Sequence, residues 1–91
     1  MGESRGALYS NGTASAQIKA VAGRVYGILI NSHTSGTLKL WDSLTAANAV
    51  VMNTFTLAAG SQVLEFPEPI VCNTGIFLTI GGTVDYTVLY N

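Results

Sequence analysis

The side chains in this sequence that could do chemistry are few, and their spacing does not name a reaction. General acid–base catalysis needs titratable groups held close together at the substrate. The carboxylates are Glu3, Asp42, Glu65, Glu68 and Asp85. Asp42 stands out because it shares the alternation of Leu38 and Leu40, and a partly buried carboxylate needs a hydrogen-bonded partner. We expect Asp42 to cap the turn at residues 43–45, as aspartate often does.

The sequence has one cysteine, Cys72, and one histidine, His33. A catalytic thiol needs a nearby base, and zinc needs a cluster of ligands at close spacing, whereas these two residues lie far apart in the chain. Cys72 belongs to the apolar run 70–72, which predicts a small buried side chain, and it has no partner for an internal disulfide. Gly81-Gly82 lacks the lysine that follows a phosphate-binding loop. We therefore predict no catalytic residue, no metal site and no cofactor.

The aromatic side chains are candidates for either the core or a binding surface. Trp41 lies in the polar phase of its segment, beside Lys39, and an exposed tryptophan can anchor an interface or stack on a sugar. For Trp41, and for Tyr86 and Tyr90 of the last segment, burial in the core is nevertheless the favoured interpretation, and an interface or a sugar contact is the alternative. In the first segment only Leu8 and Tyr9 can pack. The candidate interface residues are Leu8, Tyr9, Trp41 and Tyr90.

The elements that would position these residues are short strands. Apolar and polar residues alternate from residue 14 onward, and glycine punctuates nearly every turn. The expected strands cover residues 14–22, 24–31, 37–43, 49–57, 62–66, 70–72, 76–80 and 83–90. Even spacing of this kind indicates a sandwich or barrel. We predict an all-β, single-domain β-sandwich over residues 14–91, jelly-roll-like with about seven to eight antiparallel strands, after an extended arm over residues 1–13.

The segment 24–31 is apolar on both faces, which is typical of a central strand covered on two sides. Strict alternation separates Val25 with Leu29 from Tyr26 with Ile28 and Ile30. Gly27 indicates a bulge or a close backbone approach. In the last segment, alternation places Val84, Tyr86, Val88 and Tyr90 on one face.

Composition limits the partners. The chain has 91 residues, 48% hydrophobic and 10% charged, against about 25% charged in a typical domain. The net charge is -1 and the basic residues form no run, so we expect no nucleic-acid partner. No apolar stretch approaches the roughly 20 residues that span a bilayer, so we expect no membrane partner. A near-zero net charge favours a protein that hides surface in an interface; a surface polar in Ser, Thr and Asn is the alternative.

Several segments resemble small structural proteins encoded by tailed bacteriophages. The resemblance covers about residues 14–91 and rests on residues 23–28, 36–43, 56–60, 66–67, 75–76 and 82–83. It implies a β-sandwich virion component, with a capsid decoration (cement) protein as the leading case. Such proteins are commonly trimeric on the outer head surface and have no active site. The resemblance thus implies a homotrimer, made in the host cytoplasm, that binds the major capsid protein at the capsid surface, and we expect residues 2–11 to contact a neighbour.

Three alternatives stay open. A tail or fibre module that recognises host glycan would expose Trp41 and a tyrosine along one groove. Another virion structural protein, at the head–tail junction or in the tail, would form rings. A small enzyme is the weakest alternative, because no pair of groups here suits the roles of nucleophile and base.

Overall fold

The computed structural model describes residues 8–91, and every regular element in that range is a β-strand. The strands are β1 (Leu8–Gly12), β2 (Ala16–Lys19), β3 (Gly23–Asp42), β4 (Ala49–Thr56), β5 (Gln62–Cys72) and β6 (Ile76–Tyr90). All their pairings are antiparallel and join them into one six-stranded sheet. The predicted all-β, antiparallel class is confirmed.

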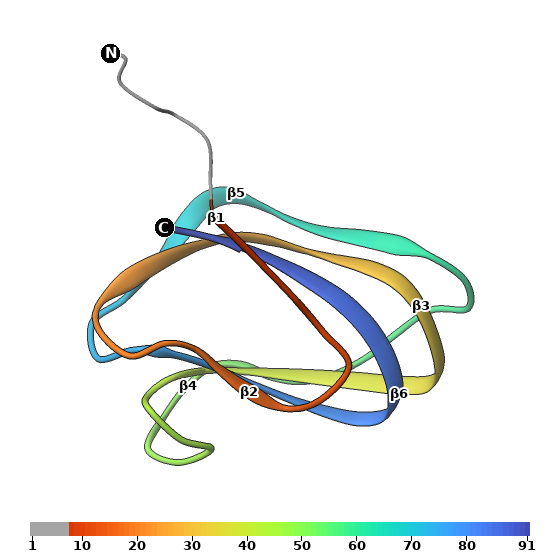
Figure 1. Ribbon diagram of the computed structural model, residues 1–91, viewed down its shortest axis with the longest axis horizontal. Coiled ribbons are helices and arrows are strands. Elements are labelled where there is room, and N and C mark those ends of the chain that lie inside the picture. The colour runs from red at the N-terminus through yellow and green to blue at the C-terminus, as the bar shows by residue number, and fades with distance from the viewer. Residues whose placement is uncertain (1–7) are drawn as a thin grey trace.

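Two long strands fold this single sheet into two layers. β3 has 20 residues and β6 has 15, and they pair with each other along most of their length. The first part of β3 also pairs with β5 and its second part with β4, while the two parts of β6 pair with β2 and then β1. One layer therefore has the order β5-β3-β6-β1 and the other β4-β3-β6-β2. Figure 1 shows β3 and β6 bending together at the right of the view, so the molecule is sandwich-like.

The long strands explain why six strands form rather than seven or eight. The segments 24–31 and 37–43 are parts of β3, 62–66 and 70–72 are parts of β5, and 76–80 and 83–90 are parts of β6. The Ser/Thr-rich stretch after residue 31 looks like a turn, yet Ser32, His33 and Thr34 keep their pairing with β6. A jelly roll, which has about eight strands in two sheets, is not confirmed.

The predicted N-terminal arm covers residues 1–13, of which residues 1–7 lie outside the described part of the chain. Leu8–Gly12 forms β1, an edge strand paired with the end of β6 from Leu8↔Tyr90 to Gly12↔Tyr86. The described part of the arm is therefore extended but belongs to the sheet.

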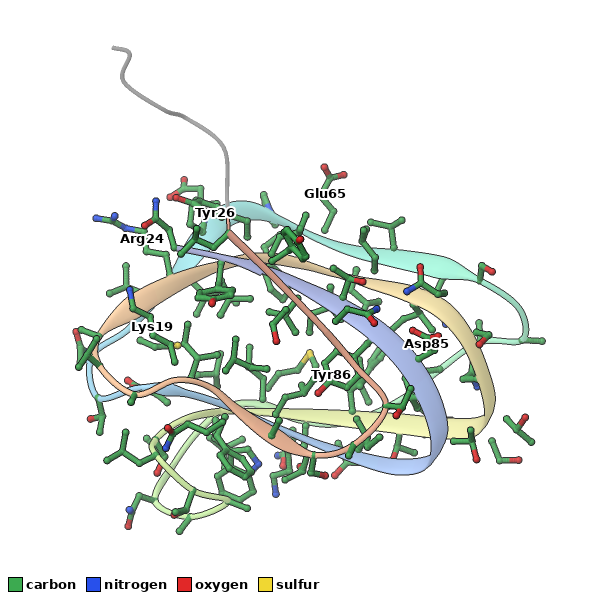
Figure 2. The ribbon with its side chains drawn as sticks, in the orientation of Figure 1. Lys19, Arg24, Tyr26, Glu65, Asp85 and Tyr86 are labelled. Carbon is green, nitrogen blue, oxygen red and sulfur yellow. The ribbon has the colours of Figure 1, made fainter. Side chains whose placement is uncertain are left out.

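The core lies between the two layers. Its buried members are Val25, Ile28, Ile30, Leu38, Leu40, Leu57, Cys72, Ile76, Leu78, Val84, Tyr86 and Val88. The predicted face of the last segment is confirmed, because Val84, Tyr86 and Val88 are buried and Tyr90 packs against them. Figure 2 shows Tyr86 inside the folded sheet.

The predicted alternation in 24–31 is wrong for Val25, which is buried together with Ile28 and Ile30. Between Val25 and Gly27, β3 has one residue more than β6, and this bulge reverses the alternation. At Gly27 the backbone runs so close to β5 that an added Cβ would lie 2.9 Å from the Leu64 carbonyl oxygen. The predicted bulge or close approach at Gly27 is confirmed.

No helix in residues 8–91 has the length and apolar character needed to cross a bilayer.

Candidate functional site

The carboxylate with the most distinctive environment, Asp42, lies at the end of β3. Its carboxylate accepts hydrogen bonds from the backbone N–H groups of Asn73 (2.9 Å), Thr74 (2.8 Å) and Gly75 (3.4 Å). Those residues form the turn between β5 and β6. Burial opposes ionisation, but these three bonds outweigh it and hold the pKa of Asp42 below its usual value of 3.8. Asp42 therefore fixes a turn.

The turn that Asp42 caps is not the predicted one. At residues 43–45 the cap is Ser43, whose Oγ accepts a hydrogen bond of 3.3 Å from the Thr45 N–H. The Asp42 side chain instead reaches a segment about thirty positions away in sequence. The prediction failed because β3 and the β5–β6 turn become neighbours only when the sheet folds.

His33 has both ring nitrogens engaged at the bend of β3. Nδ1 accepts a hydrogen bond of 3.1 Å from the Gly36 N–H, so Nε2 carries the proton and donates to the Ala58 carbonyl oxygen. The Leu57 N–H donates to the Gly36 carbonyl at 3.0 Å. His33 thereby ties the bend of β3 to the connection between β4 and β5, which leaves it no free nitrogen for a substrate.

Cys72 is buried at the end of β5, opposite Gly23 and away from the bend that holds His33. Burial and, secondarily, the charge of Asp42 raise the pKa of its thiol to about 11. A neutral, buried thiol is a poor nucleophile and a poor metal ligand. Within residues 8–91 no three residues of the types His, Cys, Asp or Glu come together as metal ligands would.

The outward faces of the two layers carry apolar side chains, which form two surfaces. One is a surface on the outside of the β4-β3-β6-β2 layer, where Trp41 lies directly across from Val50 of β4 and Phe77 of β6. The Trp41 Nε1–H donates to Thr79 Oγ1 at 3.2 Å, and Lys39 Nζ lies 4.5 Å from the centre of the indole ring. Trp41 is half-buried here and lies outside the core, so the favoured prediction of a core position is wrong for Trp41. We call Lys39, Trp41, Val50 and Phe77 the tryptophan surface.

A second apolar surface covers the outside of the β5-β3-β6-β1 layer. Its members are Tyr9 of β1, Leu89 of β6, Tyr26 and Leu29 of β3, and Val63 of β5. Tyr9 is paired with Leu89, Leu89 with Gly27, and Leu29, two residues after Gly27, with Val63, so these side chains leave the sheet on the same side. Tyr26 is half-buried and does not pack against the core. Tyr9 is 75% exposed and Val63 61% exposed. We call these five residues the tyrosine surface.

The predicted interface residues fall into two places. Leu8 and Tyr90 are cross-strand partners at the end of the sheet, where Leu8 is 54% exposed and Tyr90 packs against the core. Tyr9 follows on the outer face, whereas Trp41 lies in the other layer. The structure thus brings three of the four residues together.

Sequence reasoning missed Tyr26, Leu29, Val63, Phe77 and Leu89 as outward residues. For Val63 a signal existed, since it alternates with the inward Leu64 and shares its phase with the charged Glu65. For Leu29 the alternation with Ile28 and Ile30 was a signal, and for Tyr26 the bulge indicated by Gly27 was one, but neither shows which face of the strand meets the core.

Comparison with known proteins found no match: no protein-family model, no curated protein and no solved structure is similar to this chain.

Proposed function

We propose that this protein is a non-enzymatic capsid decoration protein of a tailed bacteriophage, which binds the outer head surface and stabilises contacts between major capsid subunits. The observation that carries the proposal is the pair of outward apolar surfaces, one on each layer. A protein that contacts both its own copies and a shell needs two such surfaces. The resemblance of residues 23–28 and 36–43 to structural proteins of tailed bacteriophages supports a phage head as that shell.

The physical properties of the chain support a life in an assembly. A 91-residue domain without a disulfide has a thin stability margin. Contacts in a trimer or on a shell would bury further apolar surface and stabilise the folded state by mass action. A homotrimer suits the three-fold positions of an icosahedral head, which lets three identical contacts form at once.

Co-sedimentation with heads tests the proposal. Purified protein is mixed with heads of the phage that encodes it, both wild-type heads and heads lacking this protein. We expect saturable binding to the heads that lack it and greater resistance of those heads to heat. Absence of binding to either kind of head would overturn the proposed function.

The mass in solution, measured by size-exclusion chromatography with light scattering, separates the structural alternatives. We expect about three times the 9.5 kDa of one chain. A mass of roughly six or twelve chains would instead favour a ring-forming tail or head-completion protein, because cyclic symmetry sets the number of copies.

Glycan recognition by a tail or fibre module is the second candidate, favoured by the tryptophan surface. The bond to Thr79 fixes the orientation of the indole, and Phe77 extends the aromatic area beside it. A glycan array would detect binding, and Trp41→Ala should abolish it while circular dichroism shows an intact fold. If the wild-type protein binds no glycan, this candidate is excluded.

A further inference from the structure

The tyrosine surface has opposite charges on its two sides. Arg24 of β3 and Glu65 of β5 are both exposed and lie in the outward phase of their strands. Figure 2 shows Arg24 on one side of Tyr26 and Glu65 on the other, with both side chains directed away from the core. Aromatic side chains with arginine at the edge are the composition that protein interfaces favour.

We propose that the tyrosine surface binds a second copy of this chain, with Arg24 of one copy facing Glu65 of the next. This inference rests on the self-association included in the proposed function and assigns it to one surface. The Arg24 side of one copy is complementary to the Glu65 side of the next, so the contact is head-to-tail, and a contact of this kind can close into the proposed trimer. Such a pairing also fixes the relative orientation of the two copies.

Neighbouring polar residues define where this contact ends. Beyond Leu29, the Asn11 amide donates to Asp85 Oδ1 (3.3 Å) and Thr87 Oγ1 (3.0 Å), and the Asn31 amide donates to the same Asp85 oxygen (3.2 Å). These groups already satisfy one another, so covering them would add little binding energy. They form a polar rim, as the periphery of an interface commonly does.

The tryptophan surface is less suited to self-association. Its one charged member is Lys39, which already lies over the indole ring of Trp41. The tryptophan surface has no acidic side chain that could face Lys39 of a neighbouring copy. The two surfaces therefore differ in charge pattern, and this difference favours the tyrosine surface for the contact between copies.

A charge-swap experiment tests the inference. The variants are Arg24→Glu, Glu65→Arg and the double variant, and light scattering over a range of concentrations gives the dissociation constant of each. We expect each single reversal to weaken association about tenfold or more, since like charges then meet, and the double reversal to restore it within about threefold. Lys39→Glu on the tryptophan surface is the matched control and should leave the mass unchanged.

Two further variants address the apolar centre without a charge. Tyr9→Ser and Val63→Thr alter highly exposed side chains, so each should fold, which circular dichroism checks, and each should weaken association. The inference is overturned if the wild-type protein is monomeric at all concentrations. It is also overturned if the single reversals have no effect, if the double variant is not restored, or if Lys39→Glu weakens association equally.

Head binding is measured on the same variants so that the two proposals fail separately. A monomer that still binds heads would overturn the assignment of the tyrosine surface and leave decoration standing. Restoration by the double reversal without any binding to heads would overturn decoration and leave the contact between copies standing.

Discussion

Asp42 illustrates how the fold uses the few charged side chains of this sequence. Asp42 is the last residue of β3, and its carboxylate holds the turn between β5 and β6 by accepting hydrogen bonds from three backbone N–H groups. A charged acceptor is worth more than a neutral one in such a cap. The residue that looked most available for chemistry thus stabilises a long-range connection.

Replacing Asp42 tests this role through its dependence on pH. The folded-state pKa of Asp42 is lowered, so its stabilisation is present above the unfolded value of 3.8 and is lost as the pH falls through the folded pKa. At pH 7 we expect Asp42→Asn to lower the free energy of unfolding by about 1–2 kcal/mol, a modest loss because the carboxylate is half-exposed and Asn keeps one acceptor oxygen. Urea unfolding at pH 7 and at pH 3 gives the difference.

The difference between wild type and Asp42→Asn should shrink at pH 3, because this pH lies below the unfolded value of 3.8, where the stabilisation by the ionised carboxylate begins to be lost. Glu68→Gln, an exposed residue of β5, is the control and should change little at either pH. An equal loss at both pH values would mean that the ionised form of Asp42 does not hold the turn.

At the scale of elements, the bends of β3 and β6 decide the architecture. Ser35 of β3 and Gly82 of β6 both have positive φ, 50° and 71°. They lie next to each other, since a Cβ added at Gly82 would overlap the carbonyl oxygen of Ser35. The two strands therefore turn at the same place, where their pairing skips Ser35, Gly36 and Gly82 between Thr34↔Thr83 and Thr37↔Gly81.

Gly82→Ala tests this bend, with Gly60→Ala as its matched control. Both glycines have positive φ, but a Cβ at Gly60 would meet nothing within 4 Å. Gly60→Ala carries only the backbone strain, about 1 kcal/mol. Gly82→Ala adds a steric clash with backbone, so we expect a loss of about 3 kcal/mol or more in the free energy of unfolding. Equal losses in the two variants would show that the bend tolerates a side chain.

Most strand segments and the inward faces of many of their residues could be predicted from the sequence, but the bends of β3 and β6 could not. The period-two alternation placed residues such as Val84, Tyr86 and Val88 on the core side correctly. The stretch Ser32–Gly36 has the composition of a turn, and nothing local indicates that its first three residues stay paired with β6. Whether such a segment ends a strand or bends it depends on a partner strand far away in sequence.

The candidate surfaces show the same limit. Trp41 and Tyr9 could be selected as interface residues because their types and phases are visible in the sequence. Tyr26 and Leu29 could not, because both faces of this segment are apolar and the sequence does not show which face meets the core or how the bulge shifts the phase of β3. The partner of Asp42 was also out of reach, since it comes from a different part of the chain.

At the scale of the whole molecule, β3 and β6 belong to both layers, so neither layer has an independent set of strands. We therefore expect a single cooperative unfolding transition. Trp41 fluorescence reports on one layer and the protection of Cys72 from iodoacetamide on the end of the other. The two urea transitions should coincide, and a midpoint for Cys72 well below that for Trp41 would contradict the shared-strand explanation.

The pairing of Leu8 with Tyr90 has a mechanical consequence. Because β1 begins where β6 ends, a pull in opposite directions on residues 8 and 91 loads the hydrogen bonds of this pair one after another. Such a load peels β1 away at low force. A load that enters along β3 and leaves along β6 must instead shear a long ladder of bonds at once, and it passes through both layers without crossing a loop. The molecule is therefore expected to resist stretching along β3 and β6 far better than it resists the separation of residues 8 and 91.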